Sequence, residues 1–225
     1  MSNVLPDLVN QTAKINEVIK CKSDVLYFIE HYIKISDDRN IILKDWQSRY
    51  LKHISNGKDA VLSDDNHSGK TLLSAIYAIW VAMFNPNRRI TFMTKNKRYE
   101  VEVLSFMEKL VKCLPDWMVP TYRIDKSTYR KSGLIFESNG SIIVISGADG
   151  DFCGYCPGDV LILDDFASFS DKGFENVCDV IPVLKGGQRN GGQMIMSYSP
   201  SNMNNSRFSE FIANNANTIF MSKED

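Results

Sequence analysis

Short apolar runs alternate along this chain with longer segments of helical spacing. A run of about four to eight apolar residues between polar or glycine residues is typical of a buried strand, whereas apolar residues repeated at i, i+3 and i+4 indicate a helix. The runs predict strands at residues 60–63, 89–94, 160–163, 193–199 and 218–221. The helical segments are residues 1–20, 24–35, 43–54, 71–84, 97–113, 172–184 and 207–214.

A turn signal in the second half of the chain predicts a hairpin. Asn139-Gly140 lies between two β-rich runs, residues 133–137 and 141–146, and Asn-Gly in that position is a strong signal for a tight turn. Apart from this hairpin, strands alternate with helices. The alternation predicts an α/β fold with a mostly parallel central sheet, flanked by helices on both faces.

Composition narrows the class of protein. A chain of 225 residues, 44% hydrophobic and 24% charged, can bury one α/β core. The net charge of −1 gives no global basic field that would attract nucleic acid. Five cysteines without a secretory signal favour a reducing compartment. The longest apolar run, from Leu72, is too short to cross a bilayer. We therefore expect a cytoplasmic protein without a membrane partner.

The segment Ser68-Gly69-Lys70-Thr71 stands between the apolar strand 60–63 and the apolar helix 71–84. A strand, a loop ending in Gly-Lys-Thr and a helix form the phosphate-binding unit of P-loop nucleotidases. Gly69 lets backbone N–H groups approach phosphate oxygens, and the helix N-terminus adds a partial positive charge. Lys70 can reach the β- and γ-phosphates, and the Thr71 hydroxyl can ligate Mg²⁺. The motif therefore predicts ATP and Mg²⁺ as ligands.

The rest of this loop departs from the full P-loop pattern. The pattern has Gly five residues before Gly69, where this chain has Asp64, and a second carboxylate follows in Asp65. Three further residues complete the predicted phosphate loop: Asn66, His67 and Ser68. An ordinary turn at the start of a helix is the alternative interpretation. The strand before the loop and the long apolar helix after it favour phosphate binding.

Two carboxylates follow the apolar strand 160–163, namely Asp164 and Asp165. Hydrolysis of a nucleoside triphosphate needs one carboxylate near Mg²⁺ and another that orients water. A buried parallel strand delivers both at its carboxyl end, where ligands bind in open α/β sheets. We expect Asp164 on the metal side and Asp165 beside the attacking water. The alternative is that the two residues merely begin a loop.

Small hydroxyl residues end the next buried strand. Ser197 and Ser199 are placed to sense the γ-phosphate and to relay its loss. A plain transition from strand to loop explains the same segment, so both interpretations stay open.

Two other groups of residues suggest different chemistry. Cys153 and Cys156 have CxxC spacing, which suits a redox pair or half a zinc site, but a zinc site needs two more ligands. Basic residues gather around the strand 89–94 and before the hairpin: Arg88, Arg89, Lys95, Lys97, Arg98, Lys126, Arg130 and Lys131. They suit either a DNA backbone or a solvated surface.

Taken together, these motifs resemble the ATPase domain of the large terminase subunit of tailed bacteriophages, the DNA-packaging motor. The resemblance runs from about residue 28 to residue 220. It is carried by LKDWQ (43–47), VLSDDNHSGKT (61–71), FMTKNKRYEVEVL (92–104), the hairpin at Asn139-Gly140, VLILDDFASF (160–169) and MIMSYSPSN (194–202). None of the chain corresponds to the nuclease domain of that family.

The resemblance implies roles for several residues. Gln47 would read the adenine edge, Lys70 and Thr71 would serve phosphate and Mg²⁺, and Asp164 would be the acidic residue on the metal side. The segment from Ser197 to Ser199 would couple hydrolysis to DNA movement. The implied fold is an ASCE-type P-loop sheet with a small lid. We accordingly expect an N-terminal helical arm or lid with the adenine side at residues 1–58, and a P-loop ATPase core at residues 59–225.

The chain also departs from the family pattern. Asn66 stands where the family has an Arg that can act as an arginine finger, and Asp165 stands where it has a catalytic Glu. A third position, in a loop that carries another Arg in relatives, reads Asp151-Phe152-Cys153-Gly154. Asp is one methylene shorter than Glu, so the carboxylate of Asp165 would sit further back, and a displacement of about 1 Å can cost about 10²-fold in rate. We therefore expect low activity in isolation.

The expected function is that of a viral ATPase domain that binds Mg-ATP and drives packaging of double-stranded DNA in the host cytoplasm. The implied partners are DNA, the portal, the small terminase subunit and further copies of the chain in a ring. Two alternatives stay open. One is a catalytically impaired pseudo-ATPase that acts as a binding or regulatory module, and the other is a helicase-type nucleic-acid ATPase.

Overall fold

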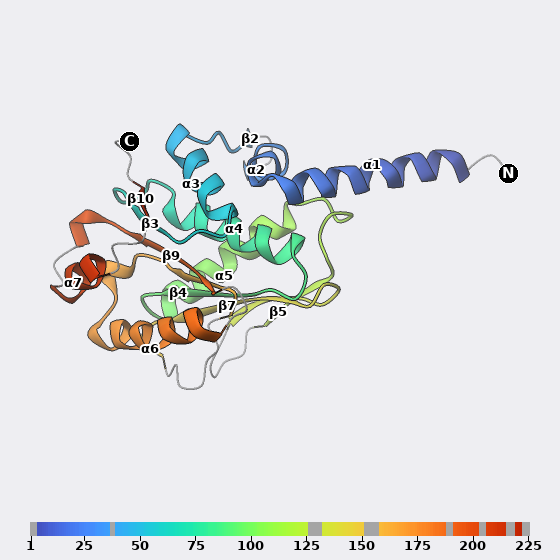
Figure 1. The fold of residues 1–225 in the computed structure, drawn as a ribbon. Helices are drawn as coiled ribbons and strands as arrows, with labels where there is room; N and C mark the ends of the chain where they lie inside the picture. Colours follow the sequence, from blue (N-terminus) through green and yellow to red (C-terminus); the bar gives the residue numbers. More distant parts are fainter. Residues whose placement is uncertain are drawn as a thin grey trace.

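In the computed structural model, eight strands form one large sheet with helices on both faces (Figure 1), and β1 and β2 form a separate two-stranded antiparallel sheet. The structure describes residues 4–36, 39–125, 132–150, 158–187, 191–202, 206–214 and 219–221. The strands are β1 (Lys34–Ser36), β2 (Arg39–Asn40), β3 (Ala60–Ser63), β4 (Arg89–Thr94), β5 (Tyr122–Asp125), β6 (Ser132–Phe136), β7 (Ser141–Gly147), β8 (Val160–Leu163), β9 (Gln193–Tyr198) and β10 (Ile219–Met221).

The helices alternate with these strands for most of the chain. They are α1 (Val4–Ser23), α2 (Val25–Tyr32), α3 (Asp45–Ser55), α4 (Lys70–Phe84), α5 (Lys97–Lys112), α6 (Asp171–Gly187) and α7 (Ser206–Asn214), with 3₁₀ turns η1 (Phe166–Ser168) and η2 (Pro200–Asn202). No helix of the described ranges has the length and apolar character needed to cross a bilayer.

The large sheet has eight strands in the order β10-β3-β9-β8-β4-β7-β6-β5. The first six are parallel to one another, while β6 runs antiparallel to both β7 and β5. This confirms the predicted α/β architecture and the hairpin at Asn139-Gly140. Strand β9 lies between β3 and β8, the two strands that precede the Gly-Lys-Thr loop and the acidic pair.

Alternate residues of the central strands pack against opposite layers, as the period of two in a strand requires. Ile162 and Ile195 belong to the core under α2 to α5, whereas their neighbours in sequence belong to the core under α6 and α7. Those neighbours are Leu161, Leu163, Met194 and Met196. The central strands are therefore buried on both faces, and their carboxyl ends are the places where polar side chains can gather.

Two expected helix ends were wrong, and one strand was missed. The helix expected over residues 24–35 ends at Tyr32, because Ile33 is extended and residues 34–36 form β1. The helix expected over residues 172–184 continues through Gly186 and Gly187. Strand β5 gave no sequence signal, since it is an edge strand without a fully buried residue.

Helix α1 extends away from the body of the protein (Figure 1). Its C-terminal end is attached by Trp80, whose Nε1 donates to the carbonyl of Cys21 at 2.7 Å. Glu17 accepts hydrogen bonds from the hydroxyls of Tyr27 and Tyr32. Helices α2 and α3 share the same hydrophobic core as α4, and this core supports the loop between β3 and α4.

Candidate functional site

The loop from β3 to α4 places its last glycine in a conformation that other residues rarely adopt. Gly69 has φ +94° and stands directly before the first residue of α4. A positive φ is accessible to glycine at little steric cost. His67 in the same loop also has a positive φ, of 65°. The sharp turn brings Lys70 and Thr71 to the helix N-terminus, where backbone N–H groups are free of helical partners.

Lys70 is a buried cation that is held by its own loop. Its Nζ donates to the carbonyls of Asp64 and Asp65, both at 2.6 Å, and to Ser199 Oγ at 3.1 Å. Burial lowers the pKa of Lys70, because removal from water disfavours the charged form. The amine is therefore fixed at the point where the phosphate loop meets the end of β9.

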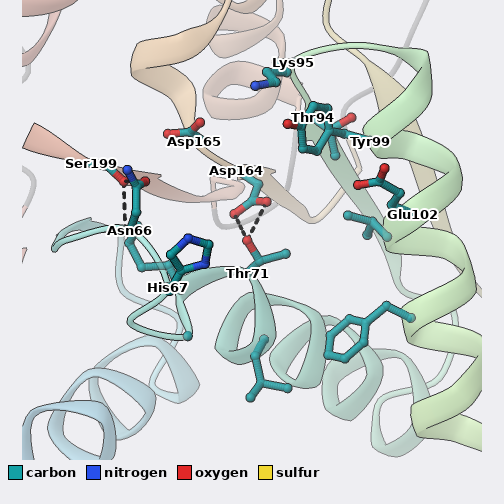
Figure 2. A pocket seen from close by; sticks show the side chains of 15 residues that line it. Asn66, His67, Thr71, Thr94, Lys95, Tyr99, Glu102, Asp164, Asp165 and Ser199 are labelled. Atoms are coloured by element: carbon teal, nitrogen blue, oxygen red, sulfur yellow. Dashed lines mark hydrogen bonds between the residues drawn. The ribbon is translucent and has the colours of Figure 1, made fainter. Parts of the chain in front are cut away.

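The side chain of Asp164 joins three elements at the carboxyl edge of the sheet. The Thr71 hydroxyl donates to it at 2.9 Å (Figure 2). The Ser197 hydroxyl donates to it at 3.0 Å. Burial raises the pKa of Asp164 to about 6, although both hydrogen bonds act in the opposite direction. Asp164 is thus a carboxylate held in an environment that disfavours its charge.

Asp165 and Ser199 are connected to this centre by hydrogen bonds. The backbone N–H of Asp165 donates to Ser197 Oγ at 3.2 Å, and its backbone is left-handed, with φ 55°. Ser199 Oγ donates to Asn66 Oδ1 at 2.7 Å (Figure 2). The end of β9 therefore contacts the acidic pair through Ser197, and the residue just beyond the strand, Ser199, contacts the phosphate loop.

These groups line a cavity of about 730 Å³ at the carboxyl edge of the sheet. Its walls include most of the predicted site: Asn66, His67, Gly69, Lys70, Thr71, Asp164, Asp165 and Ser199. The remaining wall comes from the end of β4 and from α4 and α5: Leu72, Thr94, Lys95, Tyr99, Glu102, Val103 and Phe106. Sequence reasoning did not assign this second wall to the site. The sequence indicated this wall only in that β4, like β8, is followed by polar residues.

Three predicted residues do not line the cavity, namely Gln47, Ser68 and Ser197. Gln47 Nε2 donates to the carbonyl of Ser68 at 3.2 Å, and Gln47 Oε1 accepts from the N–H of Lys44. Ser197 reaches the site only through its hydrogen bonds with the acidic pair. In this structure Gln47 thus supports the phosphate loop from the back, and the adenine role expected for it stays a prediction.

The extra acidic residues of the loop also point away from the cavity lining. Asp64 is 5% exposed, and its Oδ1 accepts from the N–H of Asp65 at 2.8 Å. Its Oδ2 has no hydrogen-bond partner among the described residues. The cavity meets neither carboxylate, so the loop offers its cation and backbone to a polyanion instead of these charges.

The donor set at Asp164 fits a magnesium ion. Mg²⁺ prefers oxygen ligands, keeps several waters, and is usually bound by one or two carboxylates together with substrate phosphates. Thr71 and Asp164 supply a hydroxyl and a carboxylate that already touch. The described ranges contain no group of three or more His, Cys, Asp or Glu that could hold a metal. The pair therefore suits an ion that arrives with a nucleotide.

Several predicted features fall outside the described residues: the CxxC pair Cys153 and Cys156, the loop from Asp151, and the basic residues Lys126, Arg130 and Lys131. Among the described basic residues, Arg88 pairs with Asp159, Lys97 with Glu100 and Arg98 with Glu102. This pairing favours the interpretation of a solvated, charge-balanced surface for these three.

Comparison with solved structures identifies the architecture. The chain is similar to the large terminase of bacteriophage HK97, with a TM-score of 0.68 and 16% identity over 89% of this chain and 43% of that one. It is also similar to the large terminase of a thermophilic bacteriophage in complex with ATP-γ-S, with a TM-score of 0.57 and 12% identity over 80% of this chain and 44% of that one.

A third similar structure is the large terminase ATPase domain of Thermus phage P74-26, with a TM-score of 0.52 and 18% identity over 68% of this chain and 63% of that one. No known family model matches the sequence. The chain spans less than half the length of the first two of these terminases. At these identities the likeness concerns the fold, and it confirms the resemblance drawn from the motifs: the chain has the fold of the ATPase domain of phage large terminases.

Proposed function

We propose that this protein is a terminase-type ATPase domain that binds Mg-ATP and powers the packaging of double-stranded DNA. One observation carries the proposal. Lys70, Thr71 and Asp164, from segments far apart in sequence, meet at one edge of the sheet in a cavity large enough for a nucleotide. Ligand pockets of about 300–1,000 Å³ are usual for small molecules.

Phosphate binding follows from the loop and the start of α4. The backbone N–H groups around Gly69 and the partial positive charge of the helix N-terminus attract phosphate oxygens. Lys70 exchanges its two carbonyl acceptors in the loop for β- and γ-phosphate oxygens. Because that amine is already partly desolvated, it gives up little water when the anion arrives, and the low-dielectric surroundings strengthen the attraction.

Hydrolysis needs a positioned water and neutralised phosphate charge. Thr71 and Asp164 would hold Mg²⁺, which supplies charge neutralisation across the β- and γ-phosphates. Asp165 orients a water whose oxygen forms a bond to the γ-phosphorus while the bond to the β,γ-bridging oxygen breaks. One hydrogen of that water stays on the phosphate, the other leaves as a proton through Asp165, and the products are ADP and phosphate.

The wider role rests on the likeness to large terminases. We propose that the chain acts on double-stranded DNA with portal and small-subunit proteins, as part of a homo-oligomeric ring in the host cytoplasm. Gln47 would contact adenine after the loop has moved, and Ser197 to Ser199 would pass the loss of γ-phosphate to the DNA-handling parts.

A single-turnover assay with labelled ATP and Mg²⁺ tests the site. Wild type should bind ATP and release phosphate slowly, and Lys70→Ala should lose binding by at least about tenfold. Lys52→Ala, an exposed lysine on α3, is the matched control and should behave as wild type. If Lys70→Ala binds ATP as well as wild type, the site assignment is wrong.

A second candidate is a pseudo-ATPase that binds nucleotide without turnover, and the cavity residues Asn66 and Asp165 favour it. The double variant Asn66→Arg, Asp165→Glu discriminates, because it restores the family's positive charge at residue 66 and the longer carboxylate side chain at residue 165. Gained turnover would indicate an impaired catalytic centre, whereas unchanged turnover in an already active protein would support the ATPase. Stronger stimulation by single-stranded than by double-stranded DNA would instead indicate a helicase-type ATPase.

A further inference from the structure

The cavity contains few positive charges for a site that must hold a triphosphate. Of the described residues that line it, only two are lysines, Lys70 and Lys95, and none is an arginine. Three carboxylates lie in the same lining: Glu102, Asp164 and Asp165. Asn66 stands at the family's arginine position. Charge that develops on the γ-phosphoryl group during hydrolysis therefore calls for a further cation besides Lys70 and the proposed Mg²⁺.

Lys95 occupies a defined place relative to the acidic pair. Strands β4 and β8 are parallel neighbours, and Met93 is in register with Leu163. Lys95 follows the last residue of β4, and Asp165 lies two residues after the end of β8, so both residues come from the carboxyl ends of neighbouring strands. Figure 2 shows the Lys95 amine directed toward the side of the cavity where Asp165 lies. The lysine thus faces the position that the attacking water and the γ-phosphate would occupy.

The backbone around Lys95 is fixed by the start of α5. Asn96 caps this helix, and its side chain accepts from the N–H groups of Arg98 and Tyr99. The Lys95 amine lies 4.2 Å from the centre of the Tyr99 ring. A cation over an aromatic face is attracted weakly when it is exposed to water, so this contact positions the amine without preventing its transfer to a phosphate oxygen.

Lys95 differs from its basic neighbours in its partners. Arg88, Lys97 and Arg98 each form an ion pair with a carboxylate, and none of them lines the cavity. Within the described part of the chain, no carboxylate forms an ion pair with Lys95. Its charge is consequently available to a ligand in the cavity.

We propose that Lys95 is a catalytic residue that contacts the γ-phosphate and supplies from the same chain the positive charge that Asn66 lacks. The inference rests on the proposed ATPase function. During the hydrolysis step described above, Lys95 stays protonated and stabilises the negative charge that spreads over the γ-phosphoryl oxygens. It neither accepts nor donates a proton.

The test compares nucleotides with and without the γ-phosphate. Dissociation constants for ATP-γ-S and ADP are measured with Mg²⁺ for wild type, Lys95→Ala, Lys95→Gln and Lys95→Arg, together with single-turnover hydrolysis of ATP. We expect Lys95→Ala and Lys95→Gln to weaken ATP-γ-S binding about tenfold while ADP binding stays constant, and to slow hydrolysis by about 10³-fold. Lys95→Arg should retain most of the ATP-γ-S affinity and most of the hydrolysis rate. Lys109→Ala, an exposed lysine of α5, should match wild type.

Each other outcome contradicts the inference in a recognisable way. Equal weakening of ADP and ATP-γ-S would place Lys95 away from the γ-phosphate. Unchanged nucleotide binding and hydrolysis with weakened binding of double-stranded DNA would make Lys95 a contact to the DNA backbone. A wild-type protein that binds neither nucleotide would overturn the proposed ATPase function itself, and with it this role of Lys95.

Discussion

The Thr71 hydroxyl donates a hydrogen bond to the Asp164 carboxylate at 2.9 Å, although 93 positions separate the two residues in sequence. The contact joins the first turn of α4 to the end of β8 across the intervening β9. It brings the two oxygen groups that Mg²⁺ would use into one place before any ligand is bound. The Gly-Lys-Thr loop and the acidic pair, each a weak signal in the sequence alone, thereby form one site.

Asp164→Asn should stabilise the ligand-free protein at neutral pH. Burial raises the pKa of Asp164 from 3.8 to about 6, so folding favours the protonated form. Its contribution to stability is full below about pH 4 and is lost as pH rises through about 6. The difference in pKa corresponds to about 3 kcal/mol in the unfolding free energy. The variant should therefore melt several degrees higher at pH 7.5 in scanning calorimetry, with the advantage shrinking toward pH 4.

The control for this measurement is Asp116→Asn, which neutralises an exposed carboxylate and should leave the melting temperature nearly unchanged. In the same preparations, Asp164→Asn should lose Mg²⁺-dependent hydrolysis, because an amide replaces the proposed metal ligand. A variant that is less stable than wild type at pH 7.5 would contradict the assignment of a buried, charge-disfavouring site.

Gly69→Ala should weaken nucleotide binding through the backbone alone. A Cβ at this position would have room, with the nearest atom, Gln47 Nε2, at 3.4 Å, but φ is +94°. An L-residue in left-handed backbone costs about 1–2 kcal/mol, and the loop can relieve this only by turning its N–H groups away from phosphate. Titration with ATP-γ-S should show an affinity loss of about tenfold.

Gly57→Ala is a matched control for that variant. Gly57 has φ +73° with nothing within 4 Å of its added Cβ, and it follows α3 outside the cavity. The two variants should lose similar stability in denaturant titration, yet only Gly69→Ala should lose affinity. Equal affinity in both would show that the positive φ of Gly69 has no role in phosphate binding.

Tyr77→Phe should lower the stability of the protein, because the Tyr77 hydroxyl connects the end of α3 with the start of β9. The Tyr77 hydroxyl lies 2.8 Å from the carbonyl of Ile54 and 2.8 Å from Gln193 Oε1. Gln193 begins β9, and its Nε2 donates to the same Ile54 carbonyl. Removing the hydroxyl leaves the buried Gln193 Oε1 without this donor, which costs about 1–3 kcal/mol. Urea unfolding should show this loss, whereas Tyr122→Phe at the sheet edge should change stability by less than about 0.5 kcal/mol.

Ser197→Ala and Ser199→Ala should separate the two halves of the site. Ser197 contacts only the acidic pair, and Ser199 contacts Lys70 and Asn66. We expect Ser197→Ala to slow single-turnover hydrolysis about tenfold or more with ATP affinity retained, because it misplaces Asp164 and Asp165. Ser199→Ala should mainly change ATP affinity. The reverse pattern would contradict this division.

Much of the fold was accessible from sequence because the central strands are buried on both faces. Residues 60–63, 89–94 and 160–163 form apolar runs with sharp polar ends, and β3, β4 and β8 have these bounds. Strands β1 and β5 escaped detection for the opposite reason. They are short or partly exposed, so their residues carry neither a continuous apolar run nor a clear alternation.

Part of the site could be predicted from the sequence for a related reason. Lys70, Thr71 and Asp164 lie at the ends of strong apolar elements, so their convergence follows from a parallel sheet. The contributions of Lys95 and Tyr99 depend on which strand lies beside β8, and a single sequence does not determine strand order. The hydrogen bond from Gln47 to the carbonyl of Ser68 likewise depends on how α3 packs against the loop. The sequence pattern of α3 does not reveal that packing.

The insertion of β9 between β3 and β8 has a mechanical consequence. Ser197 is the last residue but one of β9, and Ser199 follows the strand directly after Tyr198. One serine donates to Asp164 and the other accepts from Lys70. A displacement of this short segment along the strand axis would therefore lengthen the contact with the carboxylate and the contact with the amine together.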